Sequence, residues 1–406
     1  MKIHTKIYVI TGMILICYSF TYANLLKVKA ENNSFPHQYA QTQQAKSDSL
    51  PEGVTEDWLN NLLDEKGNKI INYDNNTTSG QIPEDPEGDA FQRKIFNGLN
   101  AGDNFGISVS NAGDVNGDGY DDIIIGAQNY SSSTGRAYIY YGGLIMSTIA
   151  NVILTGGATN NYFGRSVSSA GDVNGDGYSD VIVGAYNYNS SVGRAYIYFG
   201  GAPMNNIADV TMTGETTFNL FGISVSTAGD VNGDGFSDVI VGANGYSSNT
   251  GRAYIFLGGA AMNNTADVTM TGEASNSQFG YSISDAGDVN ADGYSDVIAG
   301  AYNYSSSAGR AYIYFGGASM NNIVDVTMTG GAAFDNFGNS VSGAGDVNGD
   351  GYSDVIAGAY GYNSSTGRAY IYFGGASMNN TADVTMTGES SGVQLGFSVS
   401  NAGDVN

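Results

Sequence analysis

The chain has few of the residues that carry covalent catalysis. Its only cysteine is Cys17, and its two histidines, His4 and His37, both precede the repeated part of the sequence described below. Nucleophilic catalysis needs a serine or cysteine beside a base such as histidine, so the repeats lack that machinery. A pair of carboxylates of the glycosidase type is the remaining catalytic option. The acidic residues that fall outside the repeat pattern are scattered, however, and we expect no enzymatic activity.

Basic residues are also scarce. The chain has 15 lysines and arginines against 39 aspartates and glutamates, which gives a formal net charge of −24. A surface this acidic repels the phosphates of nucleic acids and of anionic lipids. Neither is therefore expected as a partner.

The first residues follow a different pattern. Lys2 and Lys6 precede an uncharged apolar stretch, and Ala23 ends a short segment suited to cleavage. This pattern indicates a secretory signal peptide over residues 1–23, because the apolar stretch is short for a membrane span. We expect a secreted or cell-surface protein whose mature chain does not insert into a membrane, with an uncleaved anchor as the alternative. The mature chain would contain no cysteine and could form no disulfide.

An acidic loop of nine residues, Asp-Val-Asn-Gly-Asp-Gly-Tyr-Ser-Asp or a close variant, recurs at intervals of 58 residues. Such regularity indicates one supersecondary unit copied along the chain. Oxygen-bearing side chains occupy positions 1, 3, 5 and 9, and the carbonyl of position 7 is a further donor. Ca²⁺ takes six to eight oxygen ligands in a tolerant geometry, so we expect about five complete calcium sites and one truncated site. The candidate ligands are Asp114, Asn116, Asp118, Tyr120, Asp122, Asp172, Asn174, Asp176, Tyr178, Asp180, Asp230, Asn232, Asp234, Phe236, Asp238, Asp288, Asn290, Asp292, Tyr294, Asp296, Asp346, Asn348, Asp350, Tyr352, Asp354, Asp404 and Asn406.

The acidic loop has two other interpretations. A solvated turn rich in Asp, Asn and Gly needs no metal, although that interpretation weakens when every ligand position is kept in five copies. An EF-hand needs a glutamate at position 12 and flanking helices. Position 12 is Ile125 in the first copy and is apolar in the others, within a segment of β character, which rules out an EF-hand.

Each repeat predicts four short strands. In the second copy they are expected near residues 166–168, 181–185, 193–199 and 209–213, separated by turns rich in Gly, Asn and Ser. The second strand is apolar without alternation, which is typical of a strand covered on both faces. Four-stranded antiparallel sheets stacked face to face around an axis satisfy that requirement and limit exposed edges. The sequence therefore predicts an all-β fold, a β-propeller with a 58-residue repeat.

Three elements keep their spacing in five copies: a Phe-Gly pair, the acidic loop and a Gly-Ala pair. With them, residues 95–406 resemble the FG-GAP repeats of the integrin α-subunit propeller and its bacterial relatives, although the proline of the motif is absent and the sixth Phe-Gly is Leu395-Gly396. The resemblance implies about seven blades, so we expect a complete ring to need blades beyond Asn406. It also implies that each acidic loop joins the first and second strands of a blade and holds Ca²⁺.

Residues 24–94 differ from the repeats. They predict a polar leader, one short helix near residues 55–66 and an acidic linker. The repeats themselves carry one arginine column and one tyrosine column. The arginines are expected to pair with a carboxylate or to stack on tyrosine. The columns are Arg136, Arg194, Arg252, Arg310 and Arg368, and Tyr130, Tyr188, Tyr246, Tyr304 and Tyr362.

Two loop families are expected on the face opposite the acidic loops. One carries the tyrosine column, and the other precedes each Phe-Gly and holds most of the variation, at residues 158–161, 216–219, 275–278 and 333–336. The tyrosines either pack between blades or face a ligand. We expect an adhesion or recognition module for an extracellular protein or glycan. The alternatives are a passive scaffold within a larger secreted protein and, less favoured, a propeller attached to a hydrolase. The need for a second subunit is left open.

Overall fold

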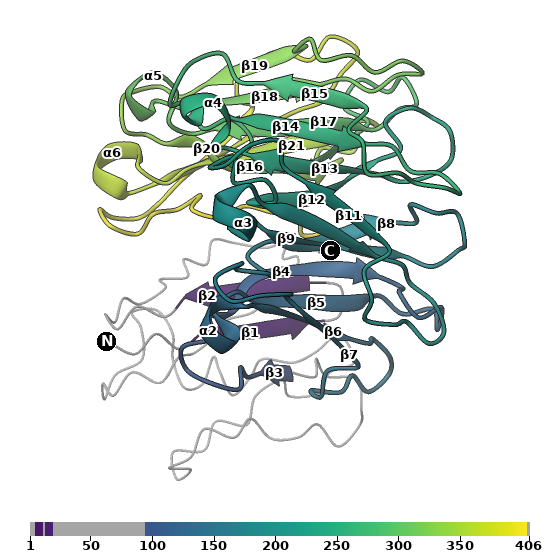
Figure 1. Cartoon of the computed structure of the whole chain (residues 1–406). Helices are drawn as coiled ribbons and strands as arrows, with labels where there is room; N and C mark the ends of the chain where they lie inside the picture. Colours follow the sequence, from purple (N-terminus) through teal and green to yellow (C-terminus); the bar gives the residue numbers. More distant parts are fainter. Residues whose placement is uncertain (1–4, 11–12, 19–93, 404–406) are drawn as a thin grey trace, which may run out of the picture. The chain divides into compact units, whose positions relative to one another are not determined.

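The computed structural model describes residues 5–10, 13–18 and 94–403 (Figure 1). β1 (Thr5–Ile10) and β2 (Met13–Tyr18) form an antiparallel hairpin, and β1 also pairs with β3 (Lys94–Phe96). The first two strands fall within the predicted signal peptide, whose cleavage stays a prediction. The predicted leader and its helix, as well as Asp404 and Asn406, lie outside the described residues.

Five four-stranded antiparallel sheets follow, and in each one the strands neighbour one another in chain order. The first and second sheets contain β4 (Phe105–Gly113), β5 (Asp122–Ala127), β6 (Arg136–Tyr140) and β7 (Val152–Thr155), then β8 (Val167–Gly171), β9 (Asp180–Ala185), β10 (Arg194–Tyr198) and β11 (Val210–Thr213). The third contains β12 (Ser224–Gly229), β13 (Asp238–Ala243), β14 (Arg252–Phe256) and β15 (Val268–Thr271). The fourth and fifth contain β16 (Ser282–Gly287), β17 (Asp296–Ala301), β18 (Arg310–Tyr314) and β19 (Val326–Thr329), then β20 (Phe337–Gly345), β21 (Asp354–Ala359), β22 (Arg368–Tyr372) and β23 (Val384–Thr387). The predicted propeller-like arrangement of four-stranded antiparallel units is confirmed.

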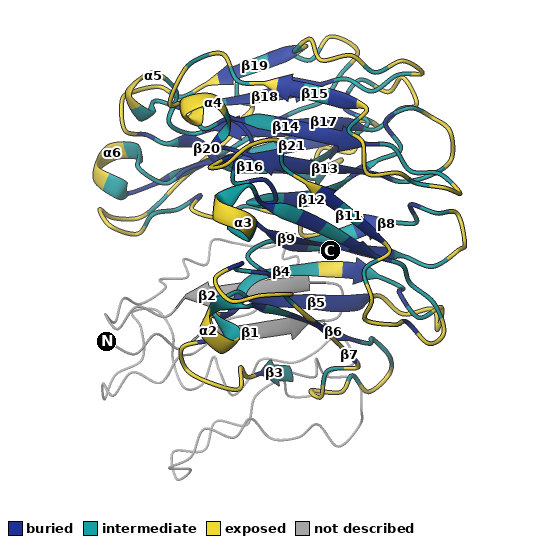
Figure 2. Ribbon diagram, in the orientation of Figure 1, coloured by how far each residue is buried: buried dark blue, intermediate teal, exposed yellow. Residues whose placement is uncertain are grey.

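The hydrophobic cores lie between sheets rather than within them. Ile139 and Leu154 on the first sheet pack with Val181 and Val183 on the second, and each later pair of neighbouring sheets repeats this arrangement. A strand in the middle of such a stack has neighbours on both faces. All six residues of β5, β9, β13 and β17 are accordingly buried (Figure 2), which explains the unbroken apolar run in the sequence.

The Phe-Gly pairs join one sheet to the next. Phe163 is buried in the core between the first two sheets, and it forms a parallel bridge with Gly135 of the first sheet. Its neighbour Gly164 places a carbonyl against Gly126, where an added Cβ would lie 2.0 Å from that oxygen. Both motif glycines are needed because the two backbones approach too closely for a side chain.

The fifth sheet is more exposed than the others on one face. Val384 and Met386 of β23 are each 38% exposed, whereas the equivalent Val268 and Met270 of β15 are 9% and 0% exposed. In the described residues, the third sheet has the fourth packed on that face, and the fifth sheet has no following sheet.

Candidate functional site

The first residue of each acidic loop organises the loop backbone. Both carboxylate oxygens of Asp114 accept backbone N–H groups: Oδ1 from Gly117 at 2.7 Å and Asp118 at 3.1 Å, and Oδ2 from Gly119 at 2.8 Å. Gly119 has a φ of +87°, a left-handed conformation that glycine adopts without strain. The expected tight acidic turn between the first and second strands is therefore present.

Positions 3 and 5 bring further oxygens into the same loop. The Asn116 amide donates to Asp118 Oδ2 at 3.0 Å, and its own oxygen accepts the Asp118 N–H at 2.8 Å. Asp118 Oδ1 in turn accepts the N–H of Tyr120 at 3.0 Å. The same hydrogen bonds recur in the other four complete loops.

Position 9 has a structural role that the sequence reasoning missed. Asp180 is fully buried, and its carboxylate accepts N–H groups from Val173 at 2.9 Å and Gly200 at 2.8 Å. It thereby fixes the acidic loop to the connection that follows the third strand. Burial raises the pKa of Asp180 to about 7, with a smaller upward contribution from Asp176 and against the two backbone hydrogen bonds. The burial of Asp122 likewise raises its pKa to about 6.

The donors in these loops suit a hard divalent cation in their chemistry. Each loop provides three carboxylates and an amide oxygen, and carboxylate and amide oxygens are typical Ca²⁺ ligands. Among the described residues, no three His, Cys, Asp or Glu side chains converge as a metal-binding group. The carboxylates accept backbone N–H groups instead, although each oxygen keeps a further lone pair. Calcium binding stays a prediction.

Successive acidic loops are hydrogen-bonded to one another. The N–H of Ser179 in the second loop donates to the carbonyl of Asp114 in the first, at 3.0 Å, and Gly201 of the second sheet donates to Val115 at 2.8 Å. Equivalent pairs link each later loop to its predecessor. The acidic loops therefore belong to the interface between sheets as well as to their own hairpins.

The opposite end of each second strand carries an unusual turn, labelled α2 (Tyr130–Ser133), α3 (Tyr188–Ser191), α4 (Tyr246–Asn249), α5 (Tyr304–Ser307) and α6 (Tyr362–Ser365) in Figure 1. In each turn three consecutive Ser or Asn residues have positive φ, for example 47°, 57° and 58° at Ser131, Ser132 and Ser133. We call these the left-handed turns. A left-handed backbone is disfavoured for residues with bulky or β-branched side chains, and in each turn the tyrosine is followed by three small polar residues, each of them Ser or Asn.

The arginine and tyrosine columns meet at these turns. The guanidinium carbon of Arg136 lies 3.7 Å from the centroid of the Tyr130 ring, and the other four pairs are 3.7 to 4.0 Å apart. The predicted stacking of arginine on tyrosine is confirmed in all five sheets. Each half-buried tyrosine is thus held by an arginine of its own sheet.

The loops that precede each Phe-Gly lie beside the left-handed turns, and the second to fifth of them contact the turns of two successive sheets. We call them approach loops: residues 98–104, 156–162, 214–220, 272–278 and 330–336. In the second one, Asn160 and Tyr162 donate their N–H groups to the Ser132 and Ser133 carbonyls, while Asn187 donates to the Asn161 carbonyl. The predicted gathering of the two loop families, away from the acidic loops, is confirmed. We call this end of the sheets the loop face.

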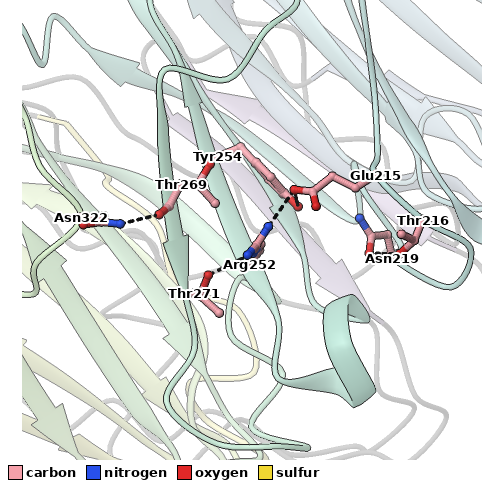
Figure 3. Close-up of polar contacts among 8 residues, drawn as sticks. All are labelled: Glu215, Thr216, Asn219, Arg252, Tyr254, Thr269, Thr271 and Asn322. Carbon is pink, nitrogen blue, oxygen red and sulfur yellow. Dashed lines mark hydrogen bonds and ion pairs between the residues drawn. The ribbon is translucent and has the colours of Figure 1, made fainter.

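Glu215 and Glu273 stand on the loop face, and they occupy the same position of the 58-residue repeat, which corrects the expectation that acids such as these are scattered outside the repeat pattern. Glu215 Oε1 accepts hydrogen bonds from Arg252 Nη1 at 2.8 Å and from the Tyr254 hydroxyl at 2.9 Å (Figure 3). Burial raises the pKa of Tyr254, and its hydrogen bond to Glu215 raises it further. Glu273 forms the same ion pair with Arg310. The second sheet has Gly157 at the position of Glu215, so carboxylate pairing of the arginine column occurs in some sheets only.

A second set of acids, outside the acidic loops, recurs with the repeat and has a role in turns. Asp209 accepts the backbone N–H of Phe199 at 2.8 Å, and Asp267, Asp325 and Asp383 make the equivalent bond. These carboxylates cap the connection between the third and fourth strands. Their recurrence in four sheets and this shared hydrogen bond account for them as structural residues.

Comparison with known proteins agrees with this architecture. A family model described as the FG-GAP repeat matches residues 105–140, 163–198, 221–256, 279–314 and 337–372. The chain is 30% identical to integrin alpha-5 of Xenopus laevis over 220 residues, which are 51% of this chain and 20% of that protein. It is 32% identical to integrin alpha-V of Gallus gallus (51% of this chain, 21% of that protein) and 33% identical to integrin alpha-PS2 of Drosophila melanogaster (54% and 16%). The chain thus matches only about a fifth of the length of these relatives.

Within residues 5–10, 13–18 and 94–403, no helix has the length and apolar character that a membrane crossing requires.

Proposed function

The chain is an FG-GAP repeat protein with an integrin-like propeller, and on that premise we propose that it is a recognition or adhesion module. The proposed ligand-binding surface is the loop face, formed by the approach loops and left-handed turns. The ligand would be an extracellular protein or glycan.

The observation that carries this proposal is the contrast between the two ends of the sheets. The five complete acidic loops differ only at positions 4, 7 and 8, whereas the approach loops share little beyond their first glycine. Phe218 and Phe334 of the approach loops are 71% and 70% exposed. Large exposed aromatic side chains on loops held by a rigid scaffold are typical of binding surfaces. A passive scaffold would have no need of that variation.

We further propose that the acidic loops bind Ca²⁺ and that the role of calcium is structural. The carboxylates of positions 1, 5 and 9, the amide oxygen of position 3 and the carbonyl of position 7 would hold the ion. Calcium, when bound, would supply positive charge that offsets the repulsion between these carboxylates. Each loop is hydrogen-bonded to the next, so occupancy of one site would also support the neighbouring sheet. At a concentration twenty times the dissociation constant, one site adds about 1.8 kcal/mol of stability.

Export is the third part of the proposal. The signal-peptide pattern in residues 1–23 supports a secreted or cell-surface location, where Ca²⁺ is abundant enough to fill weak sites. The absence of cysteine beyond Cys17 agrees with stabilisation by metal rather than by disulfides.

The calcium proposal is tested by thermal melts of the full chain with EDTA, CaCl₂ and MgCl₂. We expect a saturable rise in Tm that is selective for Ca²⁺. Asp176→Asn keeps the oxygen that accepts the Tyr178 N–H but removes the charge, so calorimetry should count one calcium fewer. An unchanged count, or a melt that ignores Ca²⁺, would contradict the proposal.

The recognition role is tested by retention of the calcium-loaded chain on immobilised extracellular-matrix glycoproteins. The variant Phe218→Ala/Phe334→Ala should lose at least tenfold in retention. The control is Ile207→Ala/Ile323→Ala, which removes two isoleucines that are 73% and 69% exposed at the other end of the sheets. Equal retention of both variants, or none by the native chain, would support the passive-scaffold alternative.

A further inference from the structure

Alternate sheets carry different residue pairs on the loop face. One variable position lies three residues before the phenylalanine of each Phe-Gly pair. It is a phenylalanine in the third and fifth sheets (Phe218 and Phe334) and an asparagine in the second and fourth (Asn160 and Asn276). The residue just before the left-handed turn changes with it. It is Gly245 and Gly361 in the third and fifth sheets, and Asn187 and Asn303 in the second and fourth. Two positions 27 residues apart therefore change together.

The asparagine pairs bridge the approach loop and the left-handed turn. The Asn187 amide donates to the Asn160 carbonyl at 2.7 Å, and Asn303 donates to the Asn276 carbonyl at 2.8 Å. In the fifth sheet, an added Cβ on Gly361 would lie 2.0 Å from the Phe334 carbonyl. The glycine lets the two backbones approach and leaves no side chain above them, so the space over the turn stays open.

The open space is a groove in the fifth sheet. A cavity of about 540 Å³ lies between the approach loop and the turn α6, with Phe334, Asp335, Tyr360, Asn363 and Ser364 among its lining residues. The Phe334 backbone is held in place, because its N–H donates to the Ser306 carbonyl at 3.1 Å. The groove thus combines an exposed aromatic ring, on a backbone that is hydrogen-bonded to the neighbouring turn, with nearby amide and hydroxyl groups.

The chemistry of the groove favours an uncharged, hydroxyl-rich ligand with one apolar face. Phe334 has no polar atom to satisfy, so its ring suits the C–H face of a pyranose. Asn363 and Ser364 can adapt their hydrogen bonds to the hydroxyls at the edge of the ring. No lysine or arginine lines the groove, and the acidic chain repels anions. The turn backbone is engaged internally, with Gly367 donating to the Tyr362 carbonyl at 3.1 Å, so an extended peptide finds few main-chain partners.

We propose that this groove binds one residue of a neutral glycan, and that the third sheet, with the same Phe/Gly pair, provides a second such site. The proposal rests on the recognition role proposed above and names its ligand class. An open groove binds a single sugar weakly. Two sites on one chain would compensate through avidity when the glycan repeats its sugar units.

The experiment is saturation-transfer NMR on the full chain with methyl β-D-glucopyranoside, methyl β-D-galactopyranoside and methyl N-acetyl-β-D-glucosaminide. We expect saturation of the ring C–H protons of at least one glycoside. The closed variant is Phe218→Asn/Gly245→Asn/Phe334→Asn/Gly361→Asn, which should reduce the signal at least fivefold. The native second and fourth sheets already accommodate these residues with similar backbone angles before the turn: φ of −98° and −94° there, against −82° and −81° at the glycines. An added Cβ at Gly245 or Gly361 would still lie 2.1 or 2.0 Å from the Phe218 or Phe334 carbonyl, so the approach loop must shift in this variant. If the variant does not fold, Phe218→Asn/Phe334→Asn, which keeps both glycines, takes its place and should reduce the signal in the same way.

Two further variants sharpen the test. Asn276→Phe/Asn303→Gly opens a groove in the fourth sheet and should raise the signal, while Ile207→Asn/Ile323→Asn should leave it unchanged. Absence of signal with all three glycosides, or equal signal from the closed variant, overturns the proposal. If the loop face retains a matrix glycoprotein but no glycoside binds, the recognition role stands and the glycan assignment fails. If Phe334→Ala alone leaves the saturation-transfer signal unchanged, the sugar does not pack on the Phe334 ring, and the glycan assignment also fails.

Discussion

Replacing Gly184 by alanine should destabilise the chain severely, because this glycine faces the backbone of the next sheet. An added Cβ would lie 2.0 Å from the Gly222 carbonyl oxygen, well inside the ~3.5 Å at which non-bonded heavy atoms make favourable contact. The clash is with backbone, so no side-chain rotation can relieve it. Gly222 would have to move, which would strain the hydrogen bond of 2.9 Å from its N–H to the Gly242 carbonyl.

The expected loss of stability for Gly184→Ala can be compared with that of two nearby glycines, Gly177 and Gly157, which lack the close backbone contact. Forcing extra volume into a packed contact costs about 3 kcal/mol, and we expect at least that for Gly184→Ala. Gly177 has a φ of +90° but no atom within 4 Å of an added Cβ, so Gly177→Ala should cost about 1 kcal/mol through backbone strain alone. Gly157 has neither constraint, and Gly157→Ala should stay within about 0.5 kcal/mol.

Thermal melts and urea unfolding of the three variants in saturating CaCl₂ measure this series. Gly184→Ala should lower Tm by about 5 °C or more, with the other two in descending order. If Gly184→Ala behaved like Gly157→Ala, the close approach of the Phe-Gly and Gly-Ala pairs would not contribute to stability. If Gly177→Ala were the most damaging, backbone conformation rather than space would explain the motif glycines.

Three more substitutions have expected outcomes. Ala291→Gly should stabilise the chain by up to about 1 kcal/mol, because Ala291 has a φ of +57°; a lower Tm would contradict this. Desolvation raises the pKa of Asp285, so its ionisation opposes folding as pH rises above its unfolded value near 4. Asp285→Asn should therefore raise Tm at pH 7 but not below pH 4, and a pH-independent effect would refute the reasoning. Glu215→Ala should cost about 1 kcal/mol, and a double-mutant cycle with Tyr254→Phe should show coupling.

Much of the fold could be predicted because the repeat multiplies weak signals. One acidic turn is ambiguous, but five at a fixed interval identified the hairpin between the first and second strands. The apolar run of residues 181–185 correctly indicated a strand covered on both faces, since burial on both sides leaves no polar position. The stacking of Arg136 on Tyr130 was one of two roles predicted for the arginines from the sequence. It could be predicted because the arginine and tyrosine columns both recur every 58 residues.

The left-handed turns and the role of position 9 were not predictable in the same way. Glycine often indicates a position with positive φ, but serine does not, so the positive φ of Ser132 could not be predicted from its residue type. Asp180 was assigned as a cation ligand because its spacing fits, but spacing does not reveal burial or the two N–H groups that approach it. The alternation of Phe334 with Asn276 is present in the sequence, yet its partner position becomes evident only when loop and turn are seen in contact.

The uneven exposure of β15 and β23 also bears on how the protein unfolds. Each hydrophobic core is shared by two successive sheets, so the chain behaves as a one-dimensional lattice with nearest-neighbour coupling. A sheet with one neighbour opens more easily than a sheet with two. Val384 and Met386 mark such a sheet, and its amide hydrogens should exchange with solvent before those of the third sheet. Cooperativity among the described sheets would then follow how completely each one is covered, with local unfolding beginning where Val384 and Met386 are exposed.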